Sequence, residues 1–269
     1  MKLQSDNFLG TRQLTRVFST ALMLVCATSS FAAPTWDIVG LKLGMTEKEA
    51  RAAIKAHSTQ ATIDEKTLKF TFSDGAKQQE TPSFLSTIQV HIPGPPGTLD
   101  NERLKLEFSA PPLEQRLIGV RRELTSYKNP PPLDRLRDSL TQKYGKPLDY
   151  ASFGIGLKSD IAKWAETGKA LCGGEKFFFP GVSQSPNDLK KFYQWQSQKL
   201  APADLSKCSA QLMAKMDYQQ GGSSVTALVV EMNDYGYILP ALEATAKWLA
   251  DKEAAARQQR LNSGTIPKL

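Results

Sequence analysis

Alternation of apolar and polar positions is the clearest pattern in the middle of the chain. Apolar side chains recur at about every second position in four segments between residues 68 and 124, with mostly polar or charged residues between them. This period of two predicts antiparallel strands with one face toward solvent. The apolar positions are Leu68, Phe70 and Phe72; Ile88, Val90 and Ile92; Leu104, Leu106 and Phe108; and Ile118, Val120 and Leu124. Proline-rich segments at 93–97 and 110–112 predict loops between them.

Helical spacing replaces this alternation in three places. Thr46 followed by Glu49 is a capping box, which predicts a helix from Glu47 to about His57. Apolar residues at Leu133, Leu136, Leu140 and Tyr144 predict a second helix, ended by residues 145–147. A third helix is expected from about residue 239 to 259, with an apolar stripe that fades beyond residue 252.

The second half of the chain adds two further strands, at about 210–218 and 225–232. Residues 148–207 are the least readable part, with candidate strands at 177–181 and 192–195. The expected fold is therefore α+β, an antiparallel sheet of six to eight strands covered by about three helices. Strand–strand–helix units are predicted at 103–145 and again at 209–256. Two explanations remain open: a diverged duplication, or a common way of covering a sheet.

The N-terminus has the features of a secretion signal. Lys2, Arg12 and Arg16 precede a short apolar run, and Ser30-Phe31-Ala32 has the small residues that a signal peptidase reads. We expect residues 1–32 to be a cleaved signal peptide. The alternatives are a lipoprotein signal that uses Cys26 and an uncleaved membrane anchor, although the run is shorter than the roughly 20 residues of a spanning helix.

The predicted domain organisation follows from this cleavage. Residues 33–252 are expected to form a soluble α+β domain, with a subdivision near residue 148 as an alternative to a single unit. Residues 253–269 are expected to form a polar helical extension and tail. The whole chain has a net charge of +7. Removal of residues 1–32 leaves 31 basic and 26 acidic residues, too small an excess to indicate a nucleic-acid partner.

Loss of the signal also leaves two cysteines, Cys172 and Cys208. Two cysteines in an oxidising compartment most often pair, and such a disulfide would stabilise the fold by roughly 3–4 kcal/mol. A catalytic Cys172 next to Gly173-Gly174 is the alternative. No metal site is expected, because His57 and His91 lack ligand spacing.

The segment Gly40-Leu41-Lys42-Leu43-Gly44-Met45-Thr46-Glu47-Lys48-Glu49-Ala50 resembles the opening of many exported bacterial proteins of unknown function. It is also similar to the SmpA/OmlA type of small outer-membrane assembly lipoproteins, in which Gly-Met-Thr opens the first helix. The resemblance implies an exported bacterial protein, of a Gram-negative cell, and supplies no activity.

No nucleophile-elbow, zinc-helix, phosphate-loop or Cys-x-x-Cys motif is present, and no cofactor is expected. We therefore expect a periplasmic or secreted, non-enzymatic protein that binds an envelope protein, glycan or lipid. Aromatic residues alternate with lysines around Phe177, Phe178, Tyr193 and Trp195. These rings are expected either to fill the core beside the disulfide or, if exposed, to form a binding surface. The alternative is a cell-envelope hydrolase with its site near His91. A small basic group, Arg121, Arg122 and Lys128, is expected on a solvated sheet face.

Overall fold

The computed structural model describes residues 36–94, 101–125, 129–171, 209–219 and 221–263. The chain divides into two units, 1–32 and 33–269, and every described residue belongs to the second. That unit is α+β, as predicted, with a large antiparallel sheet of eight strands and a separate two-stranded sheet. The predicted disulfide cysteines and aromatic binding residues lie outside the described residues.

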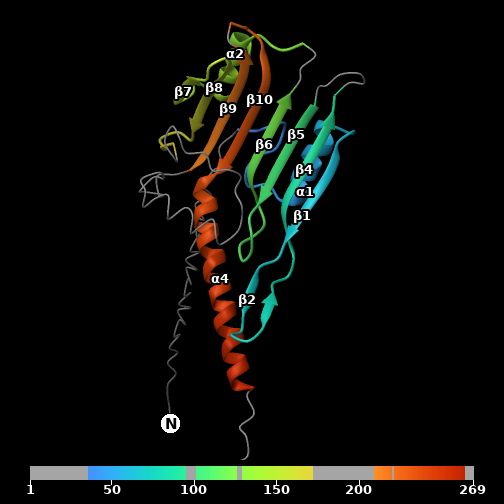
Figure 1. Ribbon diagram of the computed structural model, residues 1–269, viewed down its shortest axis with the longest axis vertical. Coiled ribbons are helices and arrows are strands. Elements are labelled where there is room, and N and C mark those ends of the chain that lie inside the picture. The colour runs from blue at the N-terminus through green and yellow to red at the C-terminus, as the bar shows by residue number, and fades with distance from the viewer. Residues whose placement is uncertain (1–35, 95–100, 126–128, 172–208, 220, 264–269) are drawn as a thin grey trace, which may run out of the picture. The chain divides into compact units, whose positions relative to one another are not determined.

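The large sheet is built from two meanders that meet in the middle (Figure 1). Its strand order is β1-β4-β5-β6-β10-β9-β8-β7, and all neighbouring strands run antiparallel. In the first meander the strands are β1 (Thr62–Leu68), β4 (Phe84–Pro93), β5 (Asn101–Phe108) and β6 (Leu117–Thr125). In the second they are β7 (Asp149–Phe153), β8 (Leu157–Ala165), β9 (Ala210–Gln219) and β10 (Val225–Asp234).

One helix precedes each meander, α1 (Glu47–His57) before the first and α2 (Leu133–Tyr144) before the second. The strand order of the large sheet is thus symmetric about the β6–β10 junction. Among the described residues, each half has one helix followed by four strands of that sheet, and the first half also contains the strands β2 and β3. Both predicted strand–strand–helix runs are present, but this symmetry groups the elements differently. The helix that follows β10, α4 (Tyr235–Asn262), has no separate counterpart after β6 among the described residues, where the next element is α2 itself.

The predicted helix boundaries follow from their capping groups. The Thr46 capping box is confirmed, with Thr46 N donating to Glu49 Oε2 at 2.8 Å. Gly145 ends α2 with a φ of 84°, a backbone conformation that glycine adopts readily. The helix α4 begins earlier than predicted, because Asp234 Oδ1 accepts from Tyr237 N and caps it upstream of Pro240.

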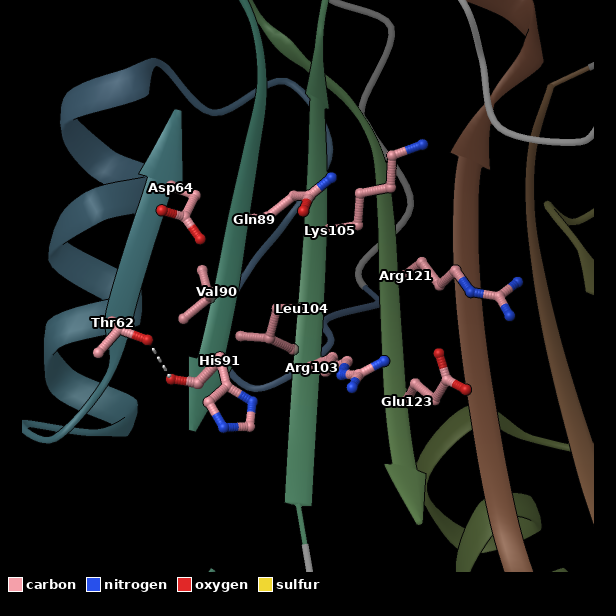
Figure 2. A pocket seen from close by; sticks show the side chains of 10 residues that line it. All are labelled: Thr62, Asp64, Gln89, Val90, His91, Arg103, Leu104, Lys105, Arg121 and Glu123. Carbon is pink, nitrogen blue, oxygen red and sulfur yellow. Dashed lines mark hydrogen bonds between the residues drawn. The ribbon is translucent and has the colours of Figure 1, made fainter. Parts of the chain in front are cut away.

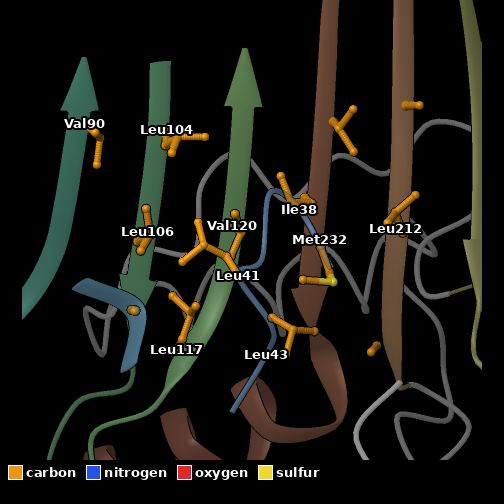
Figure 3. Close-up of a cluster of buried hydrophobic side chains, with 14 of the residues drawn as sticks. Ile38, Leu41, Leu43, Val90, Leu104, Leu106, Leu117, Val120, Leu212 and Met232 are labelled. Carbon is orange, nitrogen blue, oxygen red and sulfur yellow. The ribbon is translucent and has the colours of Figure 1, made fainter. Parts of the chain in front are cut away.

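The core lies between the sheet and the two helices α1 and α2. The segment that precedes α1 fills the centre of this core. Figure 3 shows the segment with Ile38, Leu41 and Leu43 crossing the strands near β6 and β10. Leu41 is fully buried, and Ile38 is 1% exposed. Leu117 N donates to Met45 O, and Gly44 N donates to Leu117 O, each at 2.8 Å. The residues before α1 therefore belong to the core.

The segment predicted as one strand around Leu68, Phe70 and Phe72 is two elements. β1 ends at Leu68, and β2 (Thr71–Ser73) pairs with β3 (Gln78–Glu80) as a separate hairpin. The break lies at Phe70, whose N–H donates to Thr81 Oγ1 at 3.0 Å while its ring packs on Phe84. Figure 1 shows α4 running beside this hairpin.

Candidate functional site

Over β1, β4, β5 and β6, the face of the sheet opposite α1 and α2, which we call the open face, is lined mainly by polar side chains. Alternation places Leu104 and Val120 in the core beneath the helices and their neighbours on the open face. A pocket of about 550 Å³ opens on it over β1, β4, β5 and β6 (Figure 2). Its lining residues are Thr62, Asp64, Gln89, Val90, His91, Arg103, Leu104, Lys105, Arg121 and Glu123.

Strand register arranges the eight polar lining residues in two cross-strand rows. In an antiparallel sheet, residues directly opposite each other present neighbouring side chains on the same face. The pairings along the strands give one row of Thr62, His91, Arg103 and Glu123, and a second of Asp64, Gln89, Lys105 and Arg121. Each of the four strands thereby contributes two side chains, two residues apart, to one surface.

Ion pairs hold two of the three strongly basic side chains in the rows. Lys105 Nζ lies 2.6 Å from Glu107 Oε1, and Arg121 Nη1 lies 3.1 Å from Glu231 Oε2. Both basic side chains remain about 40% exposed, so they can still contact a ligand. Arg103 is exposed and forms no ion pair with any described residue, even with its cross-strand partner Glu123. It is the cation of the two rows that is most available to a ligand.

A buried polar cluster borders the pocket on β5, β6 and β10. The side chain of Glu107 is only 8% exposed, and Asn233 Nδ2 donates to Glu231 Oε1 at 2.7 Å. Gly119 lies between them in the ladder, and a Cβ there would be 2.8 Å from Asn233 Oδ1 and 3.3 Å from Glu107 Oε2. Because Gly119 has no side chain, Asn233 Oδ1 and Glu107 Oε2 can both lie close to the backbone of β6.

His91 lines the pocket but lacks the surroundings of a catalytic base. Its backbone oxygen accepts from Thr62 Oγ1 at 3.3 Å, and its side chain is exposed (Figure 2). Within the part of the chain that the structure describes, its imidazole forms no hydrogen bond to a carboxylate or a nucleophile. The geometry gives the hydrolase alternative no support, and that alternative stays an untested prediction.

His57 has a partner that the sequence did not indicate. His57 Nε2 lies 2.9 Å from Glu102 Oε1, which also accepts from Arg122 Nε at 2.7 Å. Burial raises the pKa of Glu102, but the hydrogen bond and charge of Arg122, together with His57, outweigh it and lower the pKa. This trio joins the end of α1 to β5 and β6 on the helix side of the sheet.

The predicted basic group is divided between the two sides of the sheet. Arg121 lies on the open face and Arg122 on the helix side, because successive side chains on a strand point in opposite directions. Lys128 lies outside the described residues, as do Phe177, Phe178, Tyr193, Trp195, Cys172 and Cys208. Their predicted roles stay predictions.

The sequence did not predict four of the charged pocket residues as site residues: Asp64, Arg103, Lys105 and Glu123. The alternation of β5 already placed Arg103 and Lys105 on its polar face. Strand β1, however, has no apolar alternation, and six of its seven residues are exposed. Without the strand order, nothing in the sequence indicated that β1 and β6 would flank β4 and β5 and complete the rows.

The described residues contain no group of three or more histidine, cysteine and acidic side chains placed to hold a metal ion. None of the helices described is long and apolar enough to cross a membrane. Comparison of the chain with protein-family models, with curated proteins and with solved structures gives no match.

Proposed function

We propose that this chain is an exported, non-enzymatic binding protein that holds a polypeptide partner against the open face of its large sheet. The observation that carries the proposal is the pair of charged rows across β1, β4, β5 and β6, with Arg103 unpaired among the described residues. Groups of both signs point into one open pocket (Figure 2).

The chemistry of the pocket favours a polypeptide over the other expected envelope partners. A lipid chain needs an apolar lining, whereas eight of the ten lining residues here are polar or charged. Glycan sites commonly stack sugars on aromatic rings, and the described residues that line this pocket include no phenylalanine, tyrosine or tryptophan. The rows hold positive and negative side chains at fixed positions. They are complementary to a polypeptide that carries opposite charges in the corresponding order.

Binding is also favoured over catalysis. A hydrolytic site needs a nucleophile or an activated water within reach of a base. Among the described residues, the histidine of the pocket has no such partner, and Lys105 and Arg121 are held by carboxylates 2.6 Å and 3.1 Å away. Fixed charges of this kind orient and select a partner.

The predicted signal peptide supports an envelope location for this interaction. Residues 1–32 have the basic start, apolar core and small-residue exit of a secretion signal. The similarity of residues 40–50 to exported bacterial proteins points the same way. We therefore propose that the partner is a protein of the bacterial periplasm or outer surface.

Site-specific photo-crosslinking in intact cells tests the proposal. A photoreactive amino acid replaces Gln89 on the open face or Arg135 on α2, both of which are exposed. We expect a discrete protein adduct from position 89 and none from position 135. Adducts of equal yield from both positions, or from position 135 alone, would rule out the open face as the binding surface.

A further inference from the structure

Exposed apolar side chains gather at one edge of the sheet. Among the described residues, eight large hydrophobic side chains are exposed, and five of them lie between residues 148 and 157. Ile155, at the tip of the β7–β8 hairpin, is 98% exposed. A patch of exposed apolar side chains on an otherwise polar surface commonly marks an interaction site. The five residues are Leu148, Tyr150, Phe153, Ile155 and Leu157.

This apolar group borders a strand edge that no described strand covers. β7 is the last strand of the sheet and pairs only with β8 among the described strands. Half of its backbone N–H and C=O groups therefore point away from the ladder. Such an edge is a template for pairing with another strand.

The two edges of the sheet differ in how they discourage such pairing. β1 carries the charged run Asp64-Glu65-Lys66 and a register irregularity between Lys66 and Thr67, both of which protect edges. β7 pairs with β8 without interruption over Asp149–Phe153. Its one charged residue, Asp149, is already paired with Lys163 at 3.3 Å.

We propose that β7 pairs antiparallel with β7 of a second copy of this chain, so that two eight-stranded sheets join edge to edge in a symmetric dimer. The strand is self-complementary about Ala151. This pairing sets Tyr150 opposite Ser152 and Asp149 opposite Phe153, so no like charges meet. It also brings the exposed Leu148 of each copy beside the apolar hairpin of the other.

Light scattering and sedimentation of the purified protein over a hundredfold concentration range test this dimer. We expect a concentration-dependent dimer in the unaltered chain. Ala151→Lys sets two lysines against each other across the symmetry axis, and we expect it to raise the dimer dissociation constant at least tenfold while the thermal unfolding temperature is retained. Ile63→Lys, an exposed position on the opposite edge, is the matched control and should leave the dimer unchanged.

Oxidative crosslinking provides a second readout that does not depend on loss of association. Ala151→Cys should form an intermolecular disulfide much faster than Ile63→Cys, because only position 151 lies on the axis. A monomer at every concentration, or a dimer unaffected by Ala151→Lys, would overturn the proposal. A monomer that binds phospholipid vesicles and loses that binding in Ile155→Ser would also overturn it and assign the apolar hairpin to a membrane surface.

Discussion

At the scale of single residues, the carboxylate of Asp160 on β8 is buried and depends on hydrogen-bond donors from several elements. Its side chain is completely buried and accepts hydrogen bonds from Arg137, Tyr150, Ser152 and Tyr218. Burial raises the pKa of Asp160, but these four donors outweigh it and hold the pKa below its ordinary value. Asp160 therefore joins α2 to three strands. The sequence shows only an aspartate beside an apolar run, because its donors come from distant segments.

Asp160→Asn should lower the free energy of unfolding by about 2–4 kcal/mol, because an amide cannot accept from four donors in the same geometry. Asp138→Asn, an exposed site on α2, is the matched control and should change stability by less than about 0.5 kcal/mol. Urea titration followed by circular dichroism measures both. Equal stability of the two variants would contradict this account.

The same carboxylate predicts a pH dependence. The folded pKa of Asp160 is lowered, so its stabilising contribution is present above the unfolded pKa of about 3.9 and is lost as pH falls through the folded value. The stability difference between the unaltered chain and Asp160→Asn should be constant above about pH 5 and shrink below about pH 4. A difference that persists unchanged at pH 2.5 would show that the carboxylate charge is not its source.

Gly119 provides a second prediction at this scale. Gly119→Ala should cost about 1–3 kcal/mol, because its Cβ would lie 2.8 Å from Asn233 Oδ1. Adding Asn233→Ala should recover part of that loss by removing the clash, which a double-mutant cycle in urea measures. Strictly additive effects of the two substitutions would show that the contact does not constrain β6.

At the scale of elements, the period-two and helical patterns predicted α1, α2 and the strands from β4 to β6 closely. The missed strands lie where packing, rather than local pattern, decides the structure. Strand β1 is almost wholly exposed, and β7 carries exposed apolar residues on a sheet edge. The helix α4 was predicted, but not its contact with the β2–β3 hairpin, where Arg260 Nε donates to Asp74 O at 3.0 Å.

This contact predicts a local effect. Arg260→Ala should speed amide hydrogen exchange in residues 71–80 by roughly tenfold while leaving the exchange of the large sheet unchanged, because the hairpin loses a tie to α4. Gln259→Ala, one residue earlier on an exposed position, serves as the control. Unchanged hairpin exchange in Arg260→Ala, measured by mass spectrometry, would show that this hydrogen bond does not hold the hairpin.

At the scale of the whole described unit, a shared core joins the two helix-plus-four-strand halves. One apolar cluster contains residues of both halves, including Leu106 from β5, Met216 from β9 and Leu41 from the segment before α1. The subdivision near residue 148 considered from the sequence falls between α2 and β7. Both elements contact β8 there, α2 through Arg137 and β7 through its ladder. Because one apolar cluster spans both halves, we expect the two halves to unfold together.

Leu41→Ala tests this cooperativity. Removal of a fully buried side chain at the centre should cost about 2–5 kcal/mol and destabilise both halves equally. Tryptophan fluorescence and far-ultraviolet circular dichroism should then give coincident, shifted transitions. Leu113→Ala, at a 37% exposed position, should have a small effect. Two separated transitions in the Leu41→Ala variant would indicate halves that fold independently.

The central claim is that the charged rows of the open face bind a polypeptide partner. Its most direct test is the yield of the photo-crosslinked adduct from position 89 in cells that carry Arg103→Glu, with Arg135→Glu as a matched charge reversal on α2. We predict that Arg103→Glu lowers the adduct yield about tenfold while thermal unfolding is unchanged, and that Arg135→Glu has no effect. An adduct yield that Arg103→Glu leaves unchanged would contradict the account.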